Sequence, residues 1–250
     1  MNPGTGASAR DVSVVWHDVE CAGYSADLEL WKELADASSG PVLDLGCGVG
    51  RVGLWLAQKG HQVVGLDTDG DFISEFNRRA LDLPARARVG DAGGFELEES
   101  FDLVLAPMQL VQLLDAAEER VGCLASAARC LRPGGMLAAA IVEEAGGGRA
   151  GESTPPLPDV REVNGWVYSS LPLETVVDGD TLVVRRLRQT VAPDGDLSEE
   201  VNEIELRSLT AADLEFEGSA AGLWPAGLRE IPATEAHVGS TVVLLEKEAS

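Results

Sequence analysis

Short apolar runs alternate with amphipathic stretches through roughly the first 145 residues of the chain. Runs typical of buried parallel strands lie at 41–45, 61–67, 87–90, 101–106 and 136–142. Stretches with helical spacing separate most of them, and the first of these begins near Val52 and stops at Gly60. This order of elements predicts an α/β fold built on a doubly wound parallel sheet.

The pattern changes in the second half of the chain, where polar and apolar residues alternate. Three such runs, at 166–175, 181–191 and 200–207, are separated by Asp-Gly turn signals. They predict an antiparallel β meander inserted after the fifth strand. A Gly- and Pro-rich loop precedes it over 143–165, and we expect that loop to act as a lid. A last helix from 211 to about 221 and two closing strands follow the meander.

These patterns divide the chain into three parts. Residues 1–40 are expected to form an N-terminal tail and a cap helix, with helical spacing from 16 to 37. Residues 41–145 and 209–250 are expected to form the α/β core, and residues 146–208 the lid loop and the inserted meander.

The turn after the first strand has glycine at three alternate positions, Gly46, Gly48 and Gly50. Glycine allows positive φ angles and a close approach of a ligand to the backbone. The free N–H groups at the start of the following helix suit an anionic or strongly polar ligand. An ordinary βα turn is the alternative, and residues 48–53 also satisfy the dinucleotide pattern G-x-G-x-x-G, which is weak alone.

Two carboxylates define what this turn could bind. Asp44 lies two positions before Gly46, where its charge would repel a pyrophosphate and would suit a cationic group such as an amino-acid ammonium. Asp67 ends the second strand, 21 positions after Gly46, at the spacing that brings an acid next to a ribose bound over the first turn.

Residues 44–50, Asp-Leu-Gly-Cys-Gly-Val-Gly, resemble the first motif of class I S-adenosylmethionine-dependent methyltransferases of the small-molecule type. The Pro-Gly-Gly turn at 133–135, between a helix and the fifth strand, resembles another hallmark of that family. The resemblance covers about residues 41–145 and 209–250. It implies a Rossmann-like, doubly wound seven-stranded sheet, mostly parallel with the last strand antiparallel.

The resemblance also implies S-adenosyl-L-methionine as the cofactor and an enzyme that methylates an O or N atom of a small or medium metabolite. Because the sequence has no apolar run long enough for a membrane span and no signal-peptide pattern, we expect a cytoplasmic protein. Residues 106–109, Ala-Pro-Met-Gln, depart from the Asn-Pro-Pro-Tyr of DNA and protein-glutamine methylators, which argues against base or amide acceptors. Carried over position by position, the cofactor-binding residues would be Asp44, Gly46, Cys47, Gly48, Gly50, Asp67, Thr68, Asp91, Ala92 and Ala106.

The catalytic residues stay open at this point. Methyl transfer needs little beyond positioning, and it needs a base only when the acceptor must lose a proton. His17, Tyr24 and Gln109 are weak candidates for catalytic residues, and His17 could serve as a base. Two alternative functions remain: an NAD-dependent oxidoreductase, which the literal dinucleotide pattern favours, and a non-catalytic scaffold or sensor that binds S-adenosylmethionine.

Charge narrows the choice of partners. The chain has 19 Lys and Arg against 42 Asp and Glu, a net charge of −23. Such a surface repels phosphate backbones and anionic membranes, so we expect a small-molecule acceptor and neither nucleic acid nor membrane as a partner. The four cysteines show no zinc-ligand spacing, and no metal is expected. Exposed hairpin edges are compatible with a homodimer.

Overall fold

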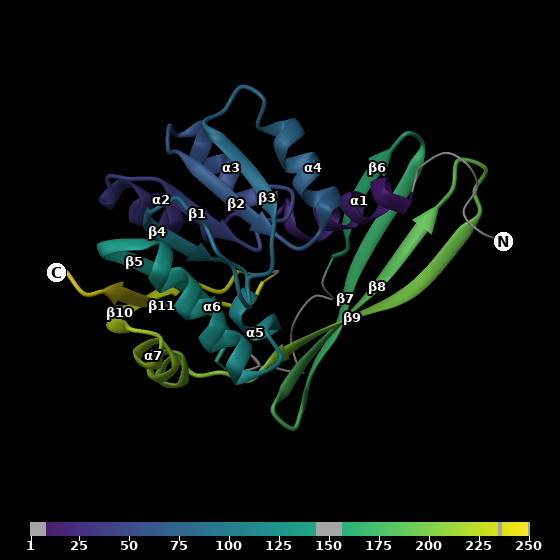
Figure 1. The fold of residues 1–250 in the computed structure, drawn as a ribbon. Coiled ribbons are helices and arrows are strands. Elements are labelled where there is room, and N and C mark those ends of the chain that lie inside the picture. The colour runs from purple at the N-terminus through teal and green to yellow at the C-terminus, as the bar shows by residue number, and fades with distance from the viewer. Residues whose placement is uncertain (1–8, 144–156, 235–236, 250) are drawn as a thin grey trace.

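The computed structural model describes residues 9–143, 157–234 and 237–249 and contains two β-sheets. The larger has seven strands in the order β10-β11-β5-β4-β1-β2-β3 (Figure 1). Its strands are β1 (Val42–Leu45), β2 (Val63–Asp67), β3 (Ala85–Val89), β4 (Phe101–Ala106), β5 (Leu131–Ile141), β10 (Leu223–Ile231) and β11 (Ser240–Lys247). Strands β5, β4, β1, β2 and β3 are parallel, and β11 runs antiparallel to β5 and β10. The predicted sheet, with its last strand reversed, is confirmed.

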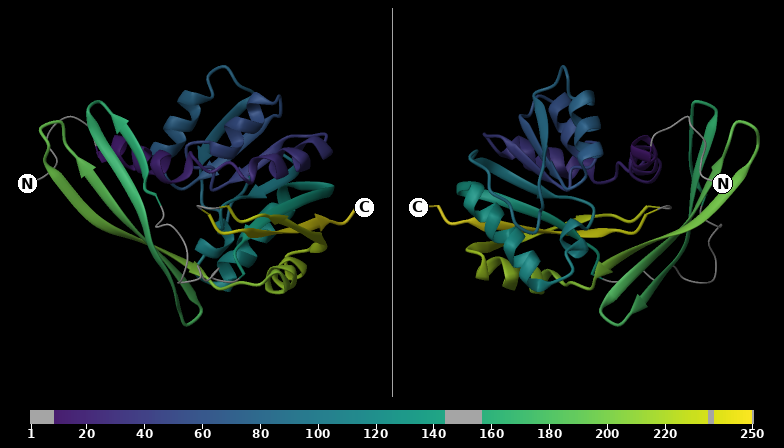
Figure 2. Two further views of the ribbon diagram at one scale, coloured as in Figure 1. Left: turned by 180° about the vertical axis from the view of Figure 1, so that it is seen from behind. Right: turned by 45° about the vertical axis from the view of Figure 1, so that its right-hand side comes forward.

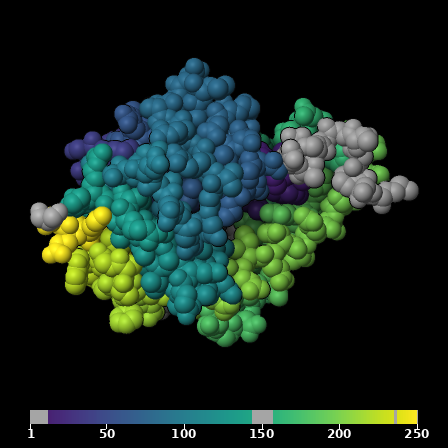
Figure 3. Space-filling model, viewed as in Figure 1, coloured from purple at the N-terminus to yellow at the C-terminus, as the bar shows by residue number. Residues whose placement is uncertain are grey.

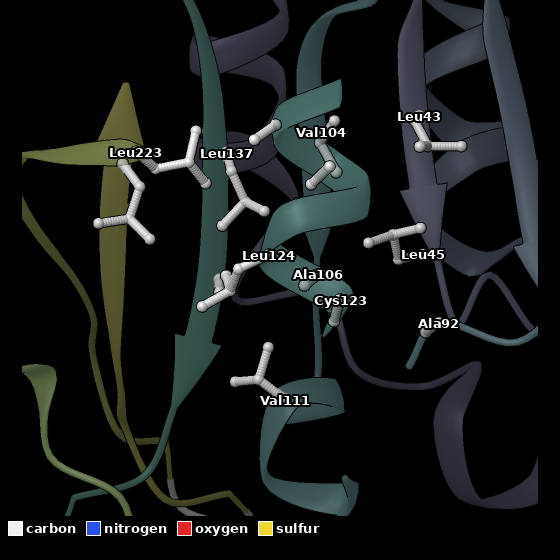
Figure 4. Close-up of a cluster of buried hydrophobic side chains, with 14 of the residues drawn as sticks. Leu43, Leu45, Ala92, Val104, Ala106, Val111, Cys123, Leu124, Leu137 and Leu223 are labelled. Atoms are coloured by element: carbon white, nitrogen blue, oxygen red, sulfur yellow. The ribbon is translucent and has the colours of Figure 1, made fainter. Parts of the chain in front are cut away.

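Strand β1 shows how the sheet is buried on both faces. All four of its residues are buried. Leu43 and Leu45 belong to one apolar cluster and Val42 to another, because successive side chains of a strand point to opposite faces. Asp44 therefore shares its face with Val42. Figure 4 shows the first cluster, in which side chains of the sheet meet Leu124 and neighbouring residues of helix α6 (Ala117–Cys130).

Helices cover both faces of the sheet. Helices α2, α3 and α4 pack on the face of Val42 and Asp44, and α6 and α7 pack on the other. The helices are α1 (Ala9–Cys21), α2 (Leu28–Ala37), α3 (Arg51–Gln58), α4 (Gly70–Arg79), α5 (Leu110–Leu113), α6 (Ala117–Cys130) and α7 (Ala211–Ala220). Within the described residues, no helix is both long and apolar enough to cross a bilayer.

The second sheet is the predicted insertion, and it stands beside the core (Figures 2 and 3). It has four antiparallel strands in chain order: β6 (Asp159–Val163), β7 (Trp166–Asp178), β8 (Thr181–Val191) and β9 (Leu197–Arg207). The expectation of three strands omits β6, which falls within the expected loop. This short strand is mostly exposed and carries three charged residues among five, so it has little apolar signal. Residues 144–156 of the expected lid lie outside the described part.

The N-terminal segment forms two helices where one was predicted, because the chain turns between Cys21 and Leu28. Helix α1 bridges the two sheets. Asp18 makes a bidentate ion pair with Arg79 of α4, with N–O distances of 2.9 and 2.7 Å. Glu20 pairs in the same way with Arg188 of β8, at 2.8 and 2.7 Å. One helix therefore ties the inserted sheet to the core.

The buried side-chain amide of Gln112 in α5 forms hydrogen bonds with the backbone at both ends of the insertion, where the chain leaves the core and where it returns. Gln112 is 1 % exposed. Its Oε1 accepts from the Val142 N–H at 2.8 Å, and its Nε2 donates to the carbonyl oxygens of Val142 at 3.0 Å and Arg207 at 2.9 Å. The side chain thus replaces the backbone pairing that the chain loses at this junction.

Replacing Gln112 by Leu should lower the free energy of unfolding by about 1–3 kcal/mol, because it leaves buried backbone groups of the junction without partners. Urea denaturation of the purified variant measures this change. The neighbouring Leu113 is half exposed, so Leu113→Ala in the same short helix is the matched control. Equal losses for the two variants would contradict a special role for Gln112.

Candidate active site

The site is built around the glycine turn between β1 and α3, at the carboxyl edge of the parallel strands. Gly46, Gly48 and Gly50 all have positive φ angles, of 60°, 52° and 100°. Residues with a Cβ rarely adopt such angles, so the turn depends on glycine. It directs the chain from β1 into the first turn of α3, where free backbone N–H groups begin.

Asp44 lies beneath this turn and is 1 % exposed. Neither of its carboxylate oxygens has a hydrogen-bond partner of normal geometry among the described residues. Burial raises the pKa of Asp44 to about 7, an effect that the nearby Arg51 guanidinium and Gly53 N–H partly offset. A buried carboxylate without a partner is costly, so this position indicates a site for a cationic or hydrogen-bonding ligand group.

Asp67 at the end of β2 is tied to the glycine turn. Its Oδ2 accepts from the Gly48 N–H at 2.8 Å, and its Oδ1 accepts from the Asp69 N–H at 3.0 Å. Each oxygen keeps further acceptor capacity for a ligand hydroxyl. The next residue, Thr68, is exposed. The carboxylate therefore both holds the turn and faces the edge at which a ribose is expected.

The other predicted cofactor residues differ in how they are placed. Asp91 follows β3 at the same edge and is exposed, and its Oδ1 accepts from the Gly93 N–H at 2.8 Å. Ala92 and Ala106 belong to the apolar core on the α6 face, and Ala106 is fully buried (Figure 4). Cys47 is 5 % exposed, and burial raises the pKa of its thiol. The side chains of Ala106 and Cys47 thus pack inside the protein, which leaves their backbones to face a ligand.

Two side chains lie directly on the glycine turn. A Cβ at Gly48 would lie 2.1 Å from His17 Nε2, and a Cβ at Gly46 would lie 2.7 Å from Leu110 Cδ1. The His17 ring also packs against Phe72, with a centroid distance of 4.8 Å. Its Nδ1 is buried without a partner in the described structure, and burial lowers the His17 pKa. A ligand above Gly48 must therefore pack against the His17 ring in this space or displace the ring.

A cavity of about 440 Å³ opens beside the turn, between the core and the inserted sheet. Gly46, Gln109 and Tyr24 line it on the core side, and Leu182 and Ile204 line it on the insert side. Its walls are mostly apolar with a few polar groups, as in sites for small molecules.

The chain after β4 is strained where it meets this cavity. Met108 and Gln109 have φ angles of 50° and 61°, which are unusual for residues with side chains. Gln109 Nε2 donates to Ser240 Oγ at 3.1 Å. Strain of this kind is concentrated at functional sites, so the position supports a role for the 107–110 segment in ligand contact.

Two residues of the site escaped the sequence prediction. Arg51, at the start of α3, makes a bidentate ion pair with the buried Asp27, at 2.7 and 2.6 Å. His237 lines the 440 Å³ cavity, and its ring lies 4.7 Å from that of Tyr24. The rarity of histidine, three in the chain, was the signal that could have drawn attention to His237. The Pro- and Gly-containing sequence around it matches no motif.

Comparison with known proteins identifies the domain. Residues 42–135 match the family model described as a methyltransferase domain. Cypemycin N-terminal methyltransferase from a Streptomyces species is 34 % identical over 94 residues, which cover 38 % of each chain. The chain spans less than half the length of the curated relatives that it matches.

Solved structures share the whole fold. DesVI from Streptomyces venezuelae superposes with a TM-score of 0.71 at 20 % identity, over 96 % of this chain and 99 % of its own. CalS10 from Micromonospora echinaspora, an amino pentose methyltransferase solved with S-adenosylmethionine, gives 0.69 at 18 % identity, over 99 % and 100 %. The predicted resemblance and its fold are confirmed.

Proposed function

Starting from a chain that carries a class I methyltransferase domain, we propose that this protein is an S-adenosylmethionine-dependent methyltransferase. It would transfer the methyl group to an O or N atom of a small or medium metabolite. The observation that carries the proposal is the glycine turn with positive φ angles above the unpartnered, buried carboxylate of Asp44. When bound, S-adenosylmethionine supplies a methyl group on a positively charged sulfur.

The residues present fit this cofactor. Asp44 offers a carboxyl group without a hydrogen-bond partner of normal geometry in the described part of the chain, and its deprotonated form suits the ammonium of the methionine part. Gly46, Gly48 and Gly50 leave no Cβ between the backbone of the turn and a ligand. Asp67 would accept from the ribose hydroxyls. The remaining proposed contacts, through side chain or backbone, are Cys47, Thr68, Asp91, Ala92 and Ala106.

The side chains above the turn do not conflict with this fit. The atoms that cover Gly48 and Gly46 belong to the side chains of His17 and Leu110, so rotation about their χ angles can clear this space. His17 also lines the 440 Å³ cavity. We infer that the His17 ring moves on cofactor binding and then borders both the cofactor and the acceptor.

Beyond cofactor binding, the protein has to position the acceptor for methyl transfer. The largely apolar cavity beside Gly46 would hold the acceptor atom in line with the methyl group. Its size suits a molecule of drug-like dimensions with an apolar body. Because CalS10 is described as an amino pentose methyltransferase, amino sugars belong among the acceptors to be tested here.

Isothermal titration separates this proposal from the oxidoreductase alternative. S-adenosylhomocysteine should bind, and NADH should not. A radiolabelled-methyl screen of alcohols, phenols, amines and amino sugars then distinguishes an enzyme from a scaffold. Tight binding of S-adenosylhomocysteine with no acceptor labelled, in metabolite extracts as well, would favour the scaffold.

Replacing Asp67 by Ala should weaken S-adenosylhomocysteine binding by about 1–3 kcal/mol, the scale of a lost hydrogen bond to a charged group. The Gly48 N–H also loses its partner in this variant. Asp67→Asn is the matched control, because its single amide oxygen can still accept from the Gly48 N–H, while only the bond from the Asp69 N–H is lost. Calorimetric affinities equal to wild type in both variants would place the ribose elsewhere.

A further inference from the structure

The loop between β10 and β11 brings a second histidine, besides His17, to the cavity. β11 runs antiparallel to β5, and Thr241 at its start pairs with Ile141 at the end of β5. The residues just before β11 therefore lie at the carboxyl edge of the parallel strands, where ligands bind in open α/β sheets. His237 is one of them and lines the 440 Å³ cavity together with Gly46 and Gln109.

The His237 ring is held from two sides. Its centroid lies 4.7 Å from that of the Tyr24 ring, at an angle of 42°. Its Nδ1 lies 3.4 Å from Thr234 Oγ1, which also accepts from the His237 N–H at 2.9 Å. We assign the tautomer with the hydrogen on Nδ1, which Thr234 Oγ1 can accept; Nε2 then carries the lone pair. No side chain or backbone group of the described residues forms a hydrogen bond with Nε2, so this atom is available to a ligand in the cavity.

Burial favours the neutral form of His237. Burial is the main cause that lowers the His237 pKa, and Arg186 of β8 and Arg51 of α3 lower it further. Asp159 of β6 and Asp27 before α2 act in the opposite direction but do not outweigh burial. Burial raises the pKa of the Tyr24 hydroxyl, so it too stays neutral near pH 7. A neutral imidazole can accept a proton at physiological pH.

We propose that His237 Nε2 accepts the proton that the acceptor's O–H or N–H group loses during methyl transfer, which makes His237 a catalytic residue. The inference rests on the proposed methyltransferase function. The lone pair of the acceptor atom forms the new bond to the methyl carbon while the S–C bond breaks, and that electron pair stays on sulfur. The acceptor proton moves to Nε2, and the imidazolium then releases it to water.

The other candidates near the cavity fit this role less well. His17 packs against Phe72 and lies on Gly48, at the cofactor side of the cavity. Gln109 has no titratable group. The raised pKa of the Tyr24 hydroxyl makes its phenolate a rare species at pH 7. His237 enters the cavity from the loop before β11, an element separate from the glycine turn, and we place the acceptor on that side.

The kinetic test compares His237→Asn with wild type, using a radiolabelled methyl donor and a panel of tyramine, 4-ethylphenol, benzylamine and simple amino sugars. With any probe that wild type methylates, kcat should fall about 10²- to 10³-fold, as expected for loss of a general base. KM and the S-adenosylhomocysteine affinity should stay within about threefold, because an Asn side chain keeps the polarity of the wall. His61→Asn, at a histidine paired with Asp36 away from the cavity, is the matched control.

The pH profile adds a readout that a structural role would not move. Wild-type kcat should fall as the pH drops through the His237 pKa in the complex, because the imidazolium cannot accept a second proton. This acidic limb should vanish in His237→Asn and persist in His61→Asn. A kcat for His237→Asn close to wild type, or a loss confined to KM, would overturn the proposal.

A second measurement needs no turnover. The Cε1–H resonances of the three histidines can be followed by NMR against pH in the S-adenosylhomocysteine complex and assigned with the single variants. The His237 resonance should titrate below the ordinary value of about 6.5. A midpoint above that value would overturn the assignment even if no acceptor has been found. Failure of S-adenosylhomocysteine to bind at all would instead overturn the proposed function.

Discussion

Replacing Asp44 by Asn is expected to make the ligand-free protein more stable at about pH 8 while it weakens cofactor binding. Burial raises the pKa of Asp44 from 3.8 to about 7, so the folded protein holds this proton more tightly than the unfolded chain does. The stabilisation that this bound proton provides is fully present below 3.8, the pKa in the unfolded chain. It is lost as the pH rises through about 7, the pKa in the folded protein. At about pH 8 the loss approaches an upper limit of about 4 kcal/mol, which Asn avoids.

Urea denaturation at two pH values measures this stabilisation. The difference in the free energy of unfolding between Asp44→Asn and wild type should grow by about 2 kcal/mol from about pH 5.5 to about pH 8. Asp82→Asn is a suitable control, because Asp82 is an exposed residue of the turn between α4 and β3. A difference that does not change with pH would mean that Asp44 is already paired or hydrated in the ligand-free protein.

The same substitution that stabilises the ligand-free protein should weaken cofactor binding. The lost charge should weaken S-adenosylhomocysteine binding by about 1.5–3 kcal/mol, or roughly 10- to 150-fold. In wild type, Asp44 must lose its proton to meet an ammonium group, so affinity should fall as the pH drops below about 7. Calorimetry should show that this pH dependence disappears in Asp44→Asn. Unchanged affinity would remove the central support for the proposed cofactor.

Replacing Arg120 by Ala is expected to lower the free energy of unfolding by about 3–5 kcal/mol, because it leaves a buried carboxylate unpaired. Arg120 of α6 and Glu217 of α7 form a bidentate pair. Nη2 lies 2.7 Å from Oε1 and Nε lies 3.0 Å from Oε2, and both side chains are 11 % exposed. Arg120 Nη1 also donates to the Leu114 carbonyl at 3.3 Å. The pair joins the two helices on one face of the sheet.

A double-mutant cycle tests the pair. Arg120→Met combined with Glu217→Leu should recover most of the stability lost in Arg120→Ala, because apolar residues can fill the space without a buried charge. Arg78→Ala is the matched control, since the exposed pair of Arg78 with Glu75 should contribute no more than about 1 kcal/mol. Additive losses across the cycle would show that the two side chains act independently.

The core could be predicted from sequence because its signals are local. A run such as 42–45 is buried on both faces, and Gly46, Gly48 and Gly50 occupy positions that require positive φ. These features can be recognised without knowledge of the partners. Strand β6 and the division between α1 and α2 were missed, because an exposed strand has no apolar run and a turn near Gly23 interrupts the pattern only briefly.

Some residues of the candidate site could likewise be predicted from local sequence spacing, and others could not. Asp44 and Asp67 were found because their distance from the glycine turn is fixed by one βαβ unit. His237 was missed because it reaches the cavity through a reversed strand about 190 residues later in the chain, which no local spacing encodes. His17 was named from the sequence as a weak candidate, but its contact with Gly48 depends on how α1 packs, which no local spacing encodes.

Helix α1 has one residue on the glycine turn, one paired with α4 and one paired with the inserted sheet. If α1 moves when the cofactor displaces the His17 ring, the movement reaches the inserted sheet through Glu20. The affinities for the methyl donor and for the acceptor would then be linked, and such linkage is reciprocal.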